Sequence, residues 1–146
     1  MKTSAIKKAC AVLLVLLGAS AVWASGNQER DQISRDFTLP AKARVEVVAI
    51  NGPVDINAID GDTATVQIER TAQSRAELDC NKIALKQAAG HLIIASENTG
   101  GCGTIQVRHR VLLSLPRYVA VSVHGVSGPI NVGEIEGALR INGNSG

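Results

Sequence analysis

The sequence predicts an all-β fold, a β-solenoid or β-helix-like stack of short strands with glycine-rich turns and a central hairpin. Three observations predict it. A ten-residue pattern that begins with Gly-Pro occurs at residues 52–61 and again at residues 128–137. Apolar and polar residues alternate along most other segments, which is the period of a strand with one buried face. No long segment has the spacing of an amphipathic helix, so the strands are expected to pack on one another.

The repeated pattern consists of Gly-Pro, an aliphatic residue, a polar residue, an aliphatic residue, two free positions, isoleucine, an acid and glycine. Units this short cannot bury an apolar face alone, so neighbouring units are expected to stack as in a solenoid. The polar residues Asp55, Asn131 and Arg140 are expected to face solvent. The aliphatic residues of both copies, and of a partial copy nine residues further on, are expected to be buried: Val54, Ile56, Ile130, Val132, Leu139 and Ile141.

The end of the sequence repeats a bend. Ser145-Gly146 repeats Ser127-Gly128 eighteen residues on, at a point where another strand is expected. The domain is therefore expected to be truncated at its C-terminus. An uncapped solenoid end exposes apolar side chains and unpaired backbone groups, so self-association through the C-terminal end is expected.

The N-terminus predicts a secretory signal peptide over residues 1–24. Three lysines precede an apolar run at residues 9–17, and small residues precede the predicted cleavage between Ala24 and Ser25. The apolar run is shorter than the roughly 20 residues that a membrane-spanning helix needs. The protein is therefore expected in the periplasm or at the cell surface of a bacterium, with no transmembrane segment after signal removal.

Charge and aromatic content argue against nucleic acid as a partner. The full sequence carries a formal charge of +2, but the signal peptide contains three lysines and no acid, so the mature chain is slightly acidic. Trp23 leaves with the signal, and Phe37 and Tyr118 are the aromatic residues that remain. A basic patch interleaved with aromatic residues, the usual sign of nucleic-acid binding, is missing from the mature sequence.

The domain is expected to occupy residues 35–146, after a polar and flexible N-terminus at residues 25–34. Phe37 and Leu39 stand two apart before Pro40, which suits an edge strand that enters the fold. Alternation with many β-branched residues predicts further strands at residues 44–50, 65–70, 104–115 and 118–124.

The segment at residues 71–89 permits two interpretations. Its composition alone favours a helix over residues 76–88. Its second half, however, alternates polar and apolar residues, and Ala89-Gly90 then separates it from another apolar run. We therefore predict a hairpin over residues 82–95, with a helical turn near Ala76.

Two cysteines, Cys80 and Cys102, remain after signal removal. An even number in an oxidising compartment predicts a disulfide, which would close the open ends of the hairpin. The alternative is a pair of buried free thiols. A zinc site is not expected, because no Cys or His stands at ligand spacing beside either cysteine.

Three acids, Asp55, Asp60 and Asp62, invite a calcium-binding or polysaccharide-cleaving interpretation. The repeat argues against it, because the corresponding positions of the second copy hold Asn131, Glu136 and Ala138. The acids also lack the spaced acid series and the glutamate of a calcium loop. We interpret them as solvated turn and surface residues.

The histidines are spread over three segments, at His91, His109 and His124. His109 follows the inward register of its strand, so we expect it in the core beside a polar partner. No metal site or other cofactor is expected from this spacing. No catalytic residue is predicted either, because the repeated serines belong to turns and lie outside a nucleophile motif.

Arg108 and Arg110 are the strongest surface candidates. Both stand at outward positions of one predicted strand, where they could contact an anionic glycan or a phosphate group. The alternative is a solvated face whose charges discourage pairing at a sheet edge.

The order of turns and strands is similar to that of a known family. The likeness is carried by Phe37-Thr38-Leu39 before residues 41–48, Asn51-Gly52 before Val54 and Ile56, Leu113-Ser114-Leu115-Pro116 before residues 118–123, and Ser127-Gly128 before Ile130 and Val132. In these features the chain resembles the bacterial putative-adhesin domain family over residues 35–146. The resemblance implies a β-solenoid-like fold outside the cytoplasm and supplies no catalytic residues. The chain departs from the family pattern by stopping at Ser145-Gly146.

These observations favour an exported, non-enzymatic β-repeat scaffold or binding module of the bacterial cell envelope. Its partner would be an envelope protein or a glycan. One alternative is a carbohydrate-active β-helix enzyme whose acids gather on one outer face. The other is an assembly element that pairs with a partner through its sheet edge.

Overall fold

The computed structural model describes residues 28–143, which form ten strands and one short helix, α1 (Arg75–Cys80). The predicted signal peptide with its Ala24–Ser25 cleavage site, and the bend at Ser145-Gly146, lie outside the described residues. Sheet A has the strand order β1 (Glu29–Thr38), β4 (Thr63–Ala72), β7 (Arg108–Pro116), β3 (Val54–Ile59) and β9 (Ile130–Val132). Sheet B has the order β10 (Leu139–Asn142), β8 (Ala120–His124), β2 (Arg44–Val48), β6 (His91–Asn98) and β5 (Asn81–Ala88).

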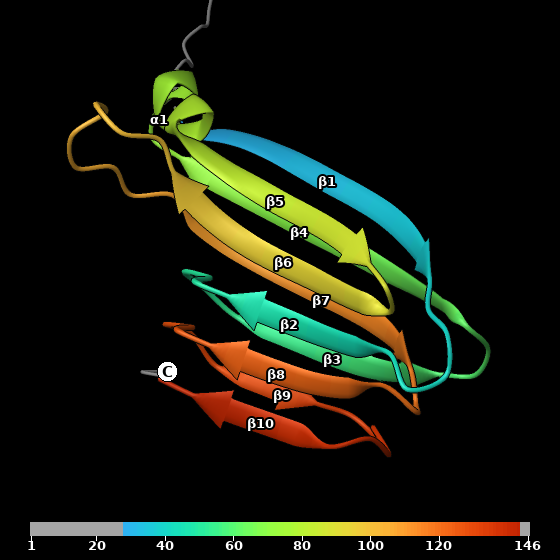
Figure 1. The fold of residues 1–146 in the computed structure, drawn as a ribbon. Coiled ribbons are helices and arrows are strands. Elements are labelled where there is room, and N and C mark those ends of the chain that lie inside the picture. Colours follow the sequence, from blue (N-terminus) through green and yellow to red (C-terminus); the bar gives the residue numbers. More distant parts are fainter. Residues whose placement is uncertain (1–27, 144–146) are drawn as a thin grey trace, which may run out of the picture.

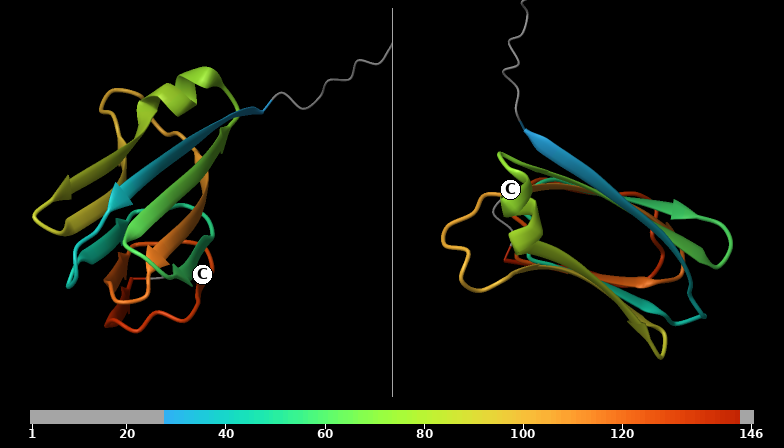
Figure 2. Two further views of the ribbon diagram at one scale, coloured as in Figure 1. Left: turned by 90° about the vertical axis from the view of Figure 1, so that its right-hand side faces the viewer. Right: turned by 90° about the horizontal axis from the view of Figure 1, so that it is seen from above.

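The two sheets form two layers around one apolar core (Figures 1 and 2). Alternate residues of the facing strands supply this core, including Val45 and Val47 from sheet B and Val66 and Ile68 from sheet A. The all-β prediction is therefore confirmed. The two sheets, however, are not closed into a coil. Strands β1, β4 and β5 at one end of the molecule pair antiparallel, and the predicted solenoid is not shown.

The two copies of the repeat lie side by side. Strand β3 of the first copy pairs in parallel with β9 of the second, with Val54 opposite Ile130 and Ile56 opposite Val132. Strands β2 and β8, which precede the copies, pair in parallel in the other sheet (Figure 1). The sequence repeat therefore corresponds to two β-turn-β units stacked in register.

The glycines of the repeat permit this close stacking. A Cβ atom on Gly128 would lie 2.3 Å from the carbonyl carbon of Gly52, and one on Gly52 would lie 1.8 Å from the carbonyl oxygen of His109. Real Cβ atoms do not approach backbone atoms so closely. Glycine is therefore required where the turns of successive units meet.

Burial follows the predicted register in part. Val54 and Ile56 are buried, Ile130 and Val132 are half-buried, and the polar Asn131 and Arg140 are exposed. Asp55, predicted to face solvent, is half-buried beside Asn131 of the neighbouring strand. The last apolar pair differs from the prediction: Leu139 is 43% exposed and Ile141 is 39% exposed. The prediction that these two are buried is wrong, because β10 is an edge strand of sheet B that, among residues 28–143, pairs only with β8.

The N-terminal strand differs from the predicted flexible segment at residues 25–34. Strand β1 already begins at Glu29 and pairs with β4 along its whole length, as an edge strand of sheet A. Contacts with β4 hold this polar strand in place: Arg70 of β4 donates to Asp31, with an Nε to Oδ1 distance of 3.0 Å. The predicted edge strand at Phe37 is thus present, but it begins eight residues earlier, at Glu29.

The central hairpin is present as β5 and β6, which pair antiparallel. Helix α1 precedes it, and its first N–H groups are capped by the Ser74 side chain, which accepts from the Glu77 N–H at 3.2 Å. The helical interpretation of residues 76–88 is therefore wrong beyond Cys80. Strand β7 starts at Arg108, so residues 99–107 form a loop where the sequence predicts a strand from Thr104.

Within residues 28–143, no helix is long and apolar enough to cross a lipid bilayer.

Candidate functional site

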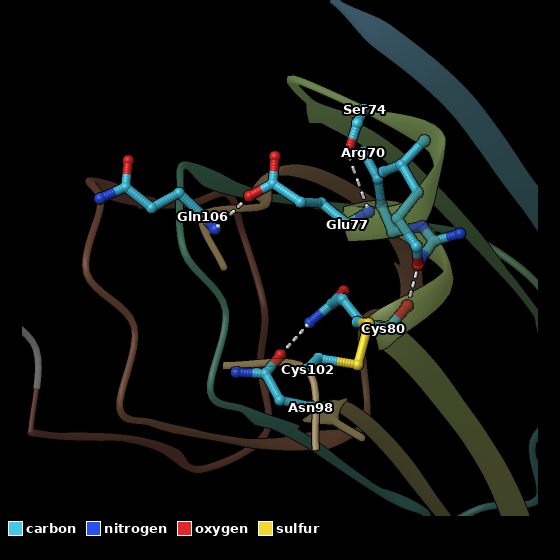
Figure 3. Close-up of a disulfide and its surroundings, with 9 residues drawn as sticks. Arg70, Ser74, Glu77, Cys80, Asn98, Cys102 and Gln106 are labelled. Carbon is cyan, nitrogen blue, oxygen red and sulfur yellow. Dashed lines mark hydrogen bonds between the residues drawn. A yellow bond between two sulfur atoms is a disulfide. The ribbon is translucent and has the colours of Figure 1, made fainter. Parts of the chain in front are cut away.

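The loop at residues 99–107 is fixed to α1 by a disulfide between Cys80 and Cys102, whose Cα atoms are 6.2 Å apart. Figure 3 shows this bond beside a second tie, in which the Gln106 N–H donates to the Glu77 carboxylate at 3.1 Å. The apolar side chains of the loop, Ile105 and Val107, pack with Leu78 of the helix. The disulfide is the one that the sequence predicts. Together with the contact to Glu77 it holds the loop, which leads into β7, against α1.

A buried polar network supports the same region. His109 is 4% exposed; its Nδ1 accepts from the Asn51 N–H at 3.0 Å, and its Nε2 lies 3.0 Å from Oδ1 of Asn81. Because Nδ1 is an acceptor, the proton of the neutral ring lies on Nε2 and is donated to Asn81. Burial, and secondly the positive charge of Arg70, lower the pKa of His109 to about 4. The predicted core position of His109 beside a polar partner is thus confirmed.

Two adjoining hollows lie on sheet A beside this loop, and we call them together the polar trough. The larger has a volume of about 490 Å³ and the smaller about 260 Å³, and they share Gln28, Thr71 and Arg108. The larger hollow adds mainly amide side chains, those of Asn51, Gln73 and Gln106. The smaller one adds charged residues, Arg30, Glu69 and Arg110.

Strand register brings the arginines of the trough together. Arg30 of β1 and Arg108 of β7 lie directly opposite Thr71 of β4, one on each side. Arg110 lies opposite Glu69, at the next outward position. The inward neighbours Ile68 and Val111 are buried in the core, so these polar side chains stand on the outer face of sheet A.

The arginines of the trough are not neutralised by close ion pairs. Among residues 28–143, no carboxylate oxygen lies within 4.0 Å of the guanidinium nitrogens of Arg30, Arg108 or Arg110. A guanidinium group can donate two parallel hydrogen bonds to a carboxylate or phosphate. The glutamine amides and the Thr71 hydroxyl can both donate and accept. The trough is therefore suited to a ligand that carries both anionic and hydroxyl groups.

The position of Arg108 and Arg110 rules out edge protection as their role, whereas a simply solvated face stays the alternative to a binding surface. Both are exposed, as the alternation predicts. Strand β7, however, lies between β4 and β3 in the interior of sheet A. The two charges therefore cannot serve to protect a sheet edge from pairing.

The other sequence candidates are dispersed. Asp55 accepts from the Asn131 amide at 2.7 Å, and Asp60 accepts from Arg117 at 2.9 Å. His91 pairs with Glu46 at 3.5 Å. In the part of the chain that the structure describes, no three His, Cys, Asp or Glu side chains are grouped so that they could hold a metal ion.

Several trough residues have no signal in the sequence. Arg30 lies in the segment predicted to be flexible, and Gln106 in a segment predicted to be a strand. Thr71 stands at an outward position of β4, and it belongs to the trough only because β1 and β7 place Arg30 and Arg108 on either side of it. Only the pairing of strands far apart in sequence reveals that these residues share one surface.

No protein-family model matches the chain, and no curated protein matches its sequence significantly. Among solved structures, the crystal structure of a putative cell adhesion protein from Clostridium sporogenes is similar at a TM-score of 0.41 and 9% sequence identity. The match covers 78% of this chain and 59% of the other protein. This chain therefore spans less than two thirds of the length of the protein that it matches. A likeness this weak supports no conclusion about fold or activity. Membership of the putative-adhesin family stays a prediction.

Proposed function

We propose that this protein is an exported, non-enzymatic binding module of the bacterial cell envelope whose polar trough binds an acidic glycan. The observation that carries the proposal is the arrangement of Arg30, Arg108 and Arg110 around an amide-lined hollow. No carboxylate oxygen of the described residues lies within 4.0 Å of their guanidinium nitrogens. The signal-peptide pattern and the disulfide between Cys80 and Cys102 agree with export to an oxidising compartment.

An acidic glycan fits the trough better than a phosphate ion does. A single phosphate would be satisfied by one or two arginines and would leave the amides of Gln28, Gln73 and Gln106 without a role. A chain of acidic sugars has carboxylates for the arginines and hydroxyl groups for the amides and for Thr71. The two adjoining hollows, about 490 and 260 Å³, leave room for several sugar units in a row.

The scaffold part of the proposal concerns the parallel units. In our proposal β2–β3 and β8–β9 are successive coils of a β-solenoid-like domain of the putative-adhesin kind. The support is their in-register stacking and the pairing of Leu139 with Val121, which repeats one coil after eighteen residues. Stacked coils of this type give a rigid platform on which outward side chains hold fixed spacings.

A second candidate function is assembly through a sheet edge. Strands β9 and β10 are edge strands at the same end of the two sheets (Figure 1), and Leu139 and Ile141 are exposed there. In this proposal a second copy of the chain pairs with that end.

The binding proposal is tested by isothermal titration calorimetry with oligogalacturonate, a short chain of acidic sugars, and with a neutral glucan of equal length. We expect the protein to bind the acidic chain and to ignore the neutral one. Arg108→Gln with Arg110→Gln should weaken binding at least fivefold. The control is Arg35→Gln, which removes an exposed charge from the same sheet outside the trough.

Two results would overturn the proposal. One is equal affinity of the double variant and the native protein. The other is a shortened sugar chain after incubation, which would favour the carbohydrate-active enzyme instead.

A further inference from the structure

A third hollow lies on the other side of the molecule, on the outer face of sheet B. Its volume is about 320 Å³, and its lining includes Arg44, Glu46, Ala120, Ser122, Ala138 and Arg140. The residues that alternate with them, Val45 and Val121, are buried in the core. We call this hollow the sheet B groove. The polar trough lies on the outer face of sheet A, so the core between the two sheets separates it from the groove. Figure 2 shows the two sheets as separate layers.

The strand register explains why a groove forms here. Arg140, Ser122 and Glu46 lie in one row across β10, β8 and β2. Ala120 and Arg44 lie in the neighbouring row. Adjacent strands are about 4.8 Å apart and neighbouring rows about 6.6 Å, so the Cα atoms of the two arginines stand roughly 12 Å from each other, diagonally across a floor of small residues.

The polar groups of the groove differ in their neighbours. The Glu46 carboxylate lies 3.5 Å from Nε2 of His91, and the Ser122 hydroxyl is hydrogen-bonded to Nε2 of His124 at 2.8 Å. For Arg44 and Arg140, the described residues provide no carboxylate oxygen within 4.0 Å. Two guanidinium groups thus flank a hollow that also offers a hydroxyl and one carboxylate, which can accept hydrogen bonds from sugar hydroxyls.

We propose that the sheet B groove is a second anion-binding site, which takes one or two acidic sugar units with a carboxylate between Arg44 and Arg140. Its volume is at the small end of the range for ligand sites, so it suits a short stretch of ligand and not a long one. With the polar trough on the opposite sheet, the domain then holds two acidic chains at once and cross-links them. The cross-linking rests on the proposed function of the trough, whereas the groove itself does not.

Native mass spectrometry with digalacturonate, a two-sugar acid, counts the sites. We expect two bound molecules per native chain and one per chain for the variant with Arg44→Gln and Arg140→Gln. One is also expected for the variant with Arg108→Gln and Arg110→Gln, and none for the combination of all four changes. Lys86→Gln, which removes an exposed charge from β5 of the same sheet, should leave two.

The outcomes separate the two proposals. If the Arg44 and Arg140 changes leave the count unchanged, the groove is not a site, whatever the trough does. If the number of bound molecules is unchanged only in the variant with the Arg108 and Arg110 changes, the trough is not a binding site and the groove is. Absence of any bound digalacturonate overturns both.

The cross-linking of two glycan chains is tested by light scattering, which measures the size of the complexes that the protein forms with long polygalacturonate. The native protein should form complexes at least several times larger than either double variant forms. Complexes of equal size for all three proteins would contradict the bridging of two chains.

Discussion

His109 shows how one buried residue fixes the start of β7 and, with it, the arginines of the trough. Its ring accepts from the Asn51 backbone on one side and donates to Asn81 on the other. The alternation of the strand predicts that His109 points inward. It does not reveal the partners, because Asn51 and Asn81 lie in distant segments that only the fold brings together.

The protonation of His109 should make stability depend on pH. In the unfolded chain the imidazole takes up a proton below its ordinary pKa of 6.5, whereas in the folded chain it stays neutral down to a pKa of about 4. Unfolding therefore binds a proton between these values, so stability should fall as the pH drops from 6.5 to 4 and then level off. The contribution is on the order of 3 kcal/mol.

Urea unfolding across this pH range checks the prediction. Between pH 7 and pH 4 the free energy of unfolding should fall more for the native protein than for His109→Gln. His91→Gln, at a partly exposed histidine, should show the same fall as the native protein. An equal fall for the native protein and His109→Gln would show that His109 is not the cause of the pH dependence.

Isoleucines of the first and second copies of the repeat should differ in their contribution to stability. Ile56 is 1% exposed between paired strands, whereas Ile130 lies in the edge strand β9 and is half-buried. Ile56→Ala should cost about 2–5 kcal/mol, and Ile130→Ala less than about 2 kcal/mol. Denaturant melts in which both variants lose the same free energy would show that the end of the stack is covered in solution.

At the scale of elements, the hairpin and its disulfide could be predicted from alternation and from the cysteine count, whereas the loop before β7 could not. Ile105 and Val107 continue the alternation of the strand, yet they pack on α1 instead of entering the sheet. A period of two does not distinguish a strand from a loop whose apolar residues face a neighbouring helix.

Loss of the disulfide should destabilise both the fold and the trough. The bond spans 22 residues, so replacing Cys80 and Cys102 by serine should cost on the order of 3 kcal/mol. Oligogalacturonate binding at the trough should weaken because Gln106 and Arg108 lose their fixed position, while the sheet B groove should be unaffected. Melts and titrations of the double variant measure both effects, and an unchanged trough affinity would show that the loop is held without the bond.

At the scale of the whole molecule, the repeat predicts the stacked parallel units but not the antiparallel strands that extend the two sheets. Strand β1 is too polar to be recognised without β4, and the order of strands in each sheet depends on contacts between distant segments. The same limit applies to the candidate sites. Arg108 and Arg110 follow from alternation, whereas Arg30, Arg44 and Arg140 join a surface only through strand pairing.

The exposed end of the stack should promote self-association. Leu139 and Ile141 belong to an edge strand with one unpaired side among the described residues, so a second copy can pair with it. Light scattering of residues 25–146 over a concentration series should show growing mass. Leu139→Lys with Ile141→Lys should abolish that growth. Leu112→Lys, at a leucine that is 38% exposed in the interior of sheet A, should not. A monomer at every concentration would contradict the prediction.

The central claim, that outward arginines of the trough bind an acidic glycan, is tested most directly by an NMR titration of the 15N-labelled protein with oligogalacturonate. The account predicts saturable shifts of the amide signals of Thr71, Gln106 and Arg108, with smaller shifts at Ser122 and Arg140 in the sheet B groove. Signals of β5 should stay in place. Shifts that are absent from Thr71, Gln106 and Arg108, or that appear equally with a neutral glucan, would contradict it.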